Sequence, residues 1–381
     1  MGGHARPQDA DRKRLQMKKY ILLLSIIISI SLTFVTAQAA TILLVENDNI
    51  NAEQLNIMVL TESGRNKLTD NGINPVFSPD KKKIAFLTFR KNGEQLDLAV
   101  MNQDGSGRTV LTNASVESFY ITHPTWFPDG KRIAYIVNAG TVRNVKKSKL
   151  NVIDLSDNKV SLLLSKDGVK ISDLAISSKG DKIAYVLDYG AAREIFILDL
   201  YNKATLAIKS GGIRDVSPTW SRDDENILFY STKSLELLLK DSNTAAYNIL
   251  AADTKTGEIE IVMPNIYGIS NYPDFPFLSP DGERIMYFAD QTDMQGRKLT
   301  LKELGTKRTV KLTLDHLLMF GNIVWSGDGK HLLYISAEES QGLFVKQVSI
   351  DHPKATQSYR YEVNPQIFPM KMFMPIKFID W

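Results

Sequence analysis

Histidine and carboxylate side chains, the groups best suited to metal or acid–base chemistry, are spread widely along this chain. No two histidines have the short spacing that places two ligands on one metal ion. We therefore expect no metal site and no cofactor. The histidines are His4, His123, His316, His331 and His352.

The usual sequence signatures of nucleophilic catalysis are also missing. The chain has no cysteine, which excludes thiol nucleophiles, and no Gly-x-Ser-x-Gly elbow. The acidic pairs Asp223-Asp224 and Glu338-Glu339 fall in predicted turns, where we expect solvated surface. The glycine-rich residues 104–107 precede strand-forming residues, whereas a phosphate-binding loop needs a following helix. These features predict that the chain is not an enzyme.

A repeated pattern must position whatever site exists, and it is clearest in the run HPTWFPDGKRIAY at residues 123–135. A large apolar residue precedes a tight turn, and an apolar triplet begins seven residues after it. Proline, aspartate and glycine each favour a particular corner of such a turn. A period of about fifty residues with strand signals is typical of an array of small sheets. The six copies begin at Phe77, Trp126, Ile176, Trp220, Leu278 and Trp325.

Each repeat is predicted to contain four short antiparallel strands, named a to d in chain order. Alternating apolar residues and turn residues at the boundaries support this prediction. The small residues Ala85, Ala134 and Ala184 in strand b predict close approach between neighbouring sheets. In the second repeat the strands fall at residues 124–127, 131–137, 149–155 and 159–164.

The two ends of the chain predict that the array closes into a ring. The first unit lacks strand a and starts with strand b at residues 41–46. The last residues, 376–381, place Trp381 in the repeat position of Trp126 and Trp325. We predict that this C-terminal strand completes the N-terminal unit, which removes exposed sheet edges. The count gives an all-β, seven-bladed β-propeller, and a six-bladed ring with irregular ends is the alternative.

Residues 1–39 are predicted to lie outside this domain. Residues 17–20 are basic, residues 21–35 are apolar, and AQA at 37–39 fits a signal-peptide cleavage site. The apolar run is shorter than the roughly 20 residues of a membrane span, although an uncleaved anchor is the alternative. We expect residues 40–381 to form a single domain that is periplasmic or secreted and not membrane-inserted.

The charge of the chain excludes some partners. The full chain has 46 Lys and Arg against 43 Asp and Glu, and the excess lies in the predicted leader. The remaining surface is nearly neutral, which argues against nucleic acid and against anionic lipid as partners.

Without cysteine, an exported protein of this length depends on burial for stability. We expect a monomer.

The Ser-Pro-Asp-Gly turns, the Pro-x-Trp strands and the Ile-Ala-Phe/Tyr triplets resemble the PD40 or WD40-like repeats of TolB-type β-propellers. The resemblance covers about residues 41–381 and is more specific for the fold than for the function. It implies a periplasmic role in the Tol-Pal envelope system, with a peptidoglycan-associated lipoprotein as partner. Only residues 40 to about 72 precede the first full repeat, so we expect no counterpart of the N-terminal α/β domain of TolB.

The resemblance also implies a docking face at the loops that lead into the innermost strands. The corresponding positions here are polar or aromatic and differ from repeat to repeat. We predict that they bind a protein partner, with Tyr272 and Phe320 as aromatic anchors. The predicted residues are Asn74, His123, Asp173, Asp215, Ser217, Tyr272, Asp274, Phe275, Phe320 and Asn322.

The tryptophans recur at one repeat position, and we predict that they form the core between blades and not a sugar-stacking site. The aspartate of each turn is predicted to be structural for the same reason. The tryptophans are Trp126, Trp220, Trp325 and Trp381.

These features together predict a non-catalytic protein-interaction propeller at the cell envelope. Two alternatives remain open. One is a metal-dependent carbohydrate-active enzyme of the lyase type, and the other is an outer-membrane assembly scaffold.

Overall fold

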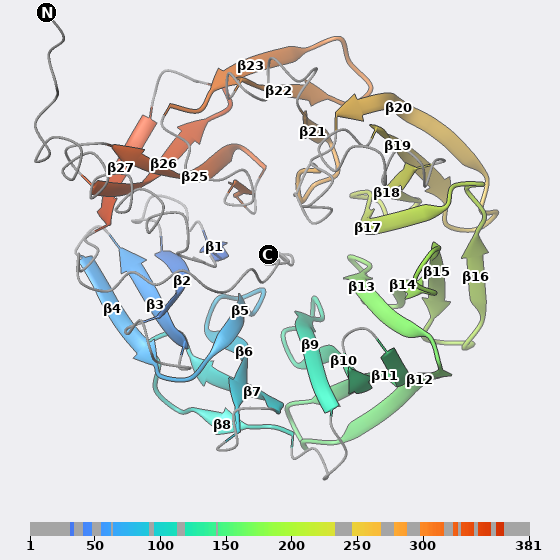
Figure 1. Ribbon diagram of the computed structural model, residues 1–381, viewed down its shortest axis with the longest axis horizontal. Coiled ribbons are helices and arrows are strands. Elements are labelled where there is room, and N and C mark those ends of the chain that lie inside the picture. Colours follow the sequence, from blue (N-terminus) through green and yellow to red (C-terminus); the bar gives the residue numbers. More distant parts are fainter. Residues whose placement is uncertain are drawn as a thin grey trace, which may run out of the picture.

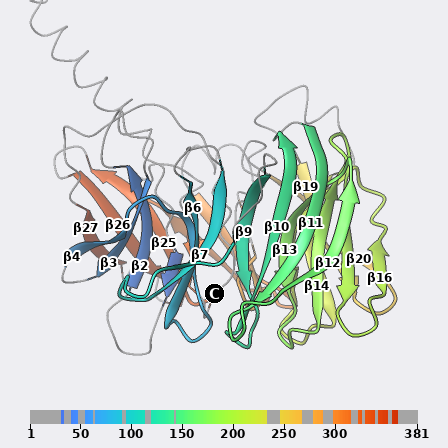
Figure 2. The same ribbon diagram turned by 90° about the horizontal axis from the view of Figure 1, so that it is seen from below.

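The regular elements of this chain are β-strands arranged as sheets around a common centre (Figure 1). Figure 2 shows the ring from the side, with the strands running along its height. Among the described residues every regular element is a strand, which confirms the all-β prediction. The computed structural model describes residues 31–33, 41–47, 55–61, 64–90, 95–112, 119–141, 144–232, 246–267, 278–287, 298–315, 323–326, 329–338, 342–351 and 356–361.

The first three sheets contain four antiparallel strands each, in chain order. The first has β1 (Ser31–Thr33), β2 (Thr41–Asn47), β3 (Leu55–Thr61) and β4 (Gly64–Thr69). The second has β5 (Ile73–Phe77), β6 (Lys83–Phe89), β7 (Leu96–Asn102) and β8 (Thr109–Val110). The third has β9 (Phe119–Trp126), β10 (Arg132–Thr141), β11 (Asn144–Asp154) and β12 (Val160–Asp167).

The fourth sheet has eight strands and consists of two halves joined by one parallel residue pair between β15 and β17. One half has β13 (Lys170–Ile176), β14 (Lys182–Asp188), β15 (Arg193–Asp199) and β16 (Thr205–Ile208). The other has β17 (Arg214–Trp220), β18 (Asn226–Thr232), β19 (Ala246–Asp253) and β20 (Ile259–Tyr267).

The last two sheets come from the C-terminal part of the chain. One has β21 (Arg284–Tyr287), β22 (Lys298–Glu303) and β23 (Thr309–Thr313), with a single bridge from Leu278 to Ile285 on its inner side. The other has β24 (Val324–Trp325), β25 (His331–Glu338), β26 (Gly342–Ser349) and β27 (Thr356–Tyr361).

No helix among the described residues is long and apolar enough to cross a membrane.

The turn between strands a and b follows the predicted chemistry. Between β9 and β10, the Asp129 carboxylate accepts hydrogen bonds from the amides of Lys131 (2.8 Å) and Arg132 (3.1 Å). Gly130 has a φ of 65°, a left-handed conformation that suits glycine. In other repeats a serine begins the turn, and its hydroxyl accepts a hydrogen bond from the backbone amide five residues ahead, which was not predicted. This bond recurs at Ser78, Ser177, Ser221, Ser279 and Ser326.

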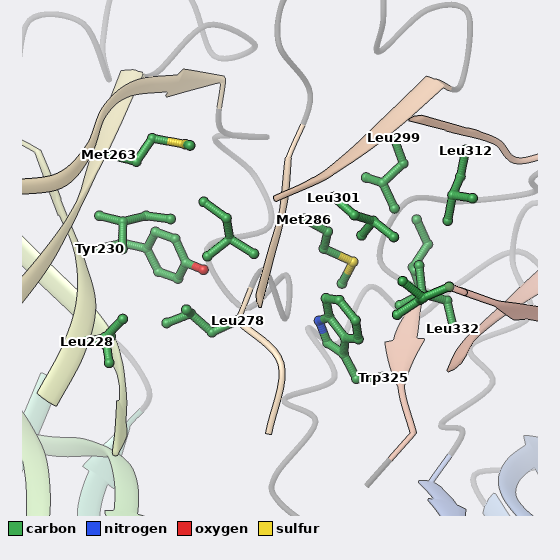
Figure 3. Close-up of a cluster of buried hydrophobic side chains, with 14 of the residues drawn as sticks. Leu228, Tyr230, Met263, Leu278, Met286, Leu299, Leu301, Leu312, Trp325 and Leu332 are labelled. Atoms are coloured by element: carbon green, nitrogen blue, oxygen red, sulfur yellow. The ribbon is translucent and has the colours of Figure 1, made fainter. Parts of the chain in front are cut away.

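The tryptophans join neighbouring blades, as predicted. The indole N–H of Trp126 donates to the carbonyl oxygen of Val76 (3.1 Å), and that of Trp220 to Ala175 (3.0 Å). In both cases the acceptor lies on the innermost strand of the preceding blade. Trp325 is buried in the cluster that Figure 3 shows, where it lies beside Met286. Trp381 lies outside the described residues.

The small residues of strand b are also where the sequence predicts them. Ala85, Ala134 and Ala184 are fully buried within the hydrophobic clusters between sheets. Because protein interiors are close-packed, larger side chains at these positions would force neighbouring sheets apart.

The expectation that the pair Asp223-Asp224 is solvated surface was wrong for Asp224. Its side chain is only 6% exposed. Its carboxylate accepts hydrogen bonds from Ser178 N (2.8 Å), Ser178 Oγ (2.7 Å) and Lys179 N (3.2 Å). Ser178 and Lys179 lie in the corresponding turn of the preceding blade, so this carboxylate joins two neighbouring turns.

The first sheet differs from the predicted ring closure. Ser31, Leu32 and Thr33 pair with Leu43, Ile42 and Thr41, so β1 takes the inner position beside β2. These residues belong to the predicted leader, and their pairing follows from the open edge that β2 offers to any strand-forming segment. Residues 376–381, which were predicted to take this position, lie outside the described residues.

Candidate functional site

The innermost strands of four blades share a β-bulge at the same repeat position. In β5, β9, β13 and β17, two residues lie opposite a single residue of the next strand. A bulge removes its extra residue from the hydrogen-bond ladder and re-aims the side chain, and bulges are common next to functional sites. The bulged pairs are Asn74-Pro75, His123-Pro124, Asp173-Leu174 and Ser217-Pro218.

The bulge explains why proline recurs in the sequence pattern. Proline has no N–H to donate to a sheet ladder and is therefore confined to edges and bulges. Pro75, Pro124 and Pro218 each occupy the second bulge position. The bulge could have been found from the sequence, because a proline inside a predicted inner strand is its signal.

The first residue of three described bulges has a left-handed backbone conformation. The φ angles are 51° for Asn74, 50° for Asp173 and 54° for Ser217. Residues other than glycine seldom adopt such angles, which cost about 1–3 kcal/mol each and cluster at functional sites. Three residues predicted for the docking face therefore share a strained and specific position.

The bulges of neighbouring blades are in direct contact. The amide of Ser217 donates a hydrogen bond to Asp173 Oδ2 (3.3 Å), which links β17 to β13. Strands β5, β9 and β13 also lie side by side near the centre of the ring (Figure 1). The structure thus brings Asn74, Asp173 and Ser217 onto one surface formed by the inner strands, together with the backbone position of His123.

The other predicted site residues are not part of this surface as described. Asp215 is only 2% exposed, so it does not face a partner. Its Oδ2 accepts a hydrogen bond from Ser210 Oγ (2.6 Å). The side chain of His123 lies outside what the structure describes, as do Tyr272, Asp274, Phe275, Phe320 and Asn322.

Burial should make the stability of the protein depend on the ionisation of Asp215. Burial raises the pKa of this carboxyl above its ordinary value, and the hydroxyls of Ser210 and Ser231 offset the rise only in part. The folded protein therefore holds this proton more tightly than the unfolded chain. Between the unfolded and folded pKa values, the contribution of Asp215 to the free energy of unfolding falls as pH rises.

We expect Asp215→Asn to remove this fall in stability with rising pH. The free energy of unfolding, measured by urea denaturation across the acidic to neutral range, should fall less with rising pH in the variant than in the wild type. Equal pH dependence in the two proteins would contradict a raised pKa at Asp215.

The repeated sheets and bulged inner strands define a protein of the β-propeller class. Residues 82–236 match the family model described as the TolB beta propeller domain, which confirms the predicted resemblance.

Among curated proteins, the chain is similar to Dipeptidyl-peptidase 5 of Porphyromonas gingivalis, with 24% identity over 319 residues. The match covers 69% of this chain and 44% of that relative, so the chain spans less than half of its length.

Solved structures give the same fold. A puromycin-hydrolyzing peptidase of Mycobacterium tuberculosis has a TM-score of 0.62 at 14% identity, covering 89% of this chain and 54% of that one. An oligogalacturonate lyase of Vibrio parahaemolyticus has a TM-score of 0.59 at 12% identity, covering 86% and 98%. At these identities the likeness establishes the fold alone.

The prediction that this chain is not an enzyme is contradicted by its similarity to a dipeptidyl-peptidase. The prediction relied on missing nucleophile and metal motifs, but one propeller fold serves both binding proteins and enzymes. In the part of the chain that the structure describes, no three His, Cys, Asp or Glu side chains gather as a metal site would require.

Proposed function

We propose that this chain is a polypeptide-binding propeller that serves peptide cleavage by holding an extended chain against its bulged inner strands. The surface formed by Asn74, Asp173 and Ser217 carries this proposal. Bulged residues leave the sheet ladder, and polypeptide backbone supplies the donors and acceptors that such positions can bind. The similarity to Dipeptidyl-peptidase 5 supports polypeptide as the ligand class.

We also propose that the ring has seven blades, with the two halves of the eight-stranded sheet counted separately. A single parallel pair joins those halves, whereas the strands within each half pair along their length. The protein is exported, and removal of residues 1–39 takes away β1. The edge of β2 is then open to residues 376–381, the strand that the sequence predicts for ring closure.

Asp173→Asn tests the binding surface. Asparagine tolerates the left-handed conformation, so the change removes the charge and leaves the backbone largely undisturbed. We expect labelled synthetic peptides of mixed sequence to bind about tenfold more weakly in fluorescence anisotropy, which corresponds to about 1.4 kcal/mol.

Asp157→Asn is the matched control, because Asp157 lies in an exposed turn and, among the described residues, accepts a hydrogen bond from Lys159 N (2.9 Å) of the same turn and from no other group. Its binding should stay within twofold of the wild type. A wild-type protein that binds no peptide, or Asp173→Asn binding at full strength, would rule the proposal out. A peptidoglycan-associated lipoprotein, the partner implied by the resemblance, is added as an unlabelled competitor in the same titration.

A further inference from the structure

Two arginines meet at the seam between the halves of the eight-stranded sheet. Arg193 begins β15 and Arg214 begins β17, and they form the parallel residue pair that joins the halves. Arg193 N donates to Ile213 O (2.9 Å), and Ile213 N donates to Thr232 O (2.7 Å), which fixes the strands at this point. Residues paired across neighbouring strands project from the same face of a sheet.

Only Arg193 of these two arginines has a carboxylate partner among the described residues. Asp188 Oδ2 lies 3.0 Å from both Nε and Nη2 of Arg193, and this pair is mostly buried. Within the described part of the chain, the guanidinium of Arg214 has no hydrogen bond or ion pair. Burial and the charge of Arg193 lower the pKa of Arg214, and electrostatic interactions with Tyr247 and Asp188 offset this only in part. A half-buried cation without a counter-ion is costly unless something pairs with it.

A tyrosine completes the set of donors. Tyr247 is buried and its ring meets that of Tyr230 edge to face, with centroids 6.5 Å apart. Arg214 pairs with Thr232 on β18, and Ser231 pairs with Asn248 on β19, which places Tyr247 two strands from Arg214 in the same sheet. Burial raises the pKa of Tyr247, and the charges of Arg214 and Arg193 reduce the rise. A guanidinium fork and a hydroxyl are the donors that recognise a carboxylate.

We propose that Arg214, Arg193 and Tyr247 form a binding site for a carboxylate. The carboxylate is that of a bound polypeptide, so this site rests on the proposed function. With Asp188 paired to Arg193, one positive charge remains, which suits a singly charged carboxylate better than a phosphate. Arg214 and Ser217 lie on the same strand, three residues or about 10 Å apart. An extended peptide held at the Asp173–Ser217 bulges can therefore place its C-terminal carboxylate at Arg214.

Pairs of peptides that differ only in a free or amidated C-terminus test this site. We expect wild-type protein to bind the free acid about tenfold more tightly than the amide. Arg214→Gln should lose this preference while binding the amide as before, and Arg214→Lys should keep part of it because the charge remains. Since Arg214 is unpaired, its loss should not lower the free energy of unfolding.

Arg222→Gln is the matched control, because Arg222 lies in the a–b turn of the same blade with 80% of its side chain exposed. Equal affinity of the acid and amide peptides for the wild type would overturn the site and leave the proposed function standing. If no peptide binds, the melting temperature is measured with acetate, galacturonate or phosphate at constant ionic strength. A rise with acetate that Arg214→Gln loses supports a carboxylate site without the peptide function, whereas a stronger response to galacturonate or phosphate overturns the ligand class.

Discussion

Replacing Asp224 with alanine should lower the free energy of unfolding by about 3–5 kcal/mol, as measured by urea denaturation. The buried carboxylate accepts three hydrogen bonds from Ser178 and Lys179 of the preceding blade, and because these bonds share one group they are not additive and together contribute about 2–3 kcal/mol. Asp224 also has a φ of 61°, where alanine costs a further 1–2 kcal/mol or so.

Two variants separate these causes. Asp224 occupies the turn position that is glycine in the Pro-Asp-Gly copies, so Asp224→Gly removes the carboxylate without backbone strain. The free energy of unfolding of this variant should fall only by the part that is due to the hydrogen bonds. The adjacent Asp223 is exposed and bonds within its own turn, to Ser221 Oγ (2.6 Å) and Glu225 N (3.0 Å). A cost for Asp223→Ala equal to that of Asp224→Ala would contradict a special role for the contact between blades.

Trp220→Ala should have an effect of similar size. Trp220 is 7% exposed and packs in the hydrophobic cluster between the two halves of the eight-stranded sheet, and deleting a buried tryptophan costs about 3–5 kcal/mol. The carbonyl oxygen of Ala175 loses its hydrogen bond at the same time. Urea denaturation followed by circular dichroism, which does not depend on tryptophan fluorescence, measures the change.

Trp220→Phe keeps most of the buried ring and removes the indole N–H. Its cost should be smaller, with about 1 kcal/mol from the lost hydrogen bond. Trp126 makes the equivalent bond to Val76, so Trp126→Phe should behave alike. Tyr201→Ala, at an exposed turn, should change stability by less than about 0.5 kcal/mol. A Trp220→Ala variant as stable as Tyr201→Ala would mean that the tryptophan does not join the blades.

The repeating part of the fold could be predicted because every blade solves the same packing problem. The spacing from Trp126 to Ile133 places both residues on one hairpin, and the structure pairs them directly. The turn residues and the buried alanines follow from the same local rules. These features depend on residues close in sequence or repeated at a fixed period.

Contacts between non-equivalent positions could not be predicted in this way. Asp223 and Asp224 are chemically identical in sequence, and only the neighbouring turn makes one exposed and the other buried. The pairing of β1 with β2 depends on which segment reaches an open edge. The juxtaposition of Arg193 and Arg214 exists only because two blades share a backbone pair.

Part of the candidate site could be predicted because its residues recur at one position of the repeat. Asn74, Asp173 and Ser217 vary in type at a fixed repeat position, which singled them out. Asp215 was predicted with them as a residue leading into an inner strand, but it is buried and accepts a hydrogen bond from Ser210 Oγ.

The bonds between blades have a consequence for the order in which the protein is made. The side chains of Trp126, Trp220 and Asp224 each reach back to backbone groups of the preceding blade. Synthesis runs from the N-terminus and folds units in that order. At these contacts each new blade therefore meets a complete partner on leaving the ribosome, and the chain can assemble blade by blade during translation.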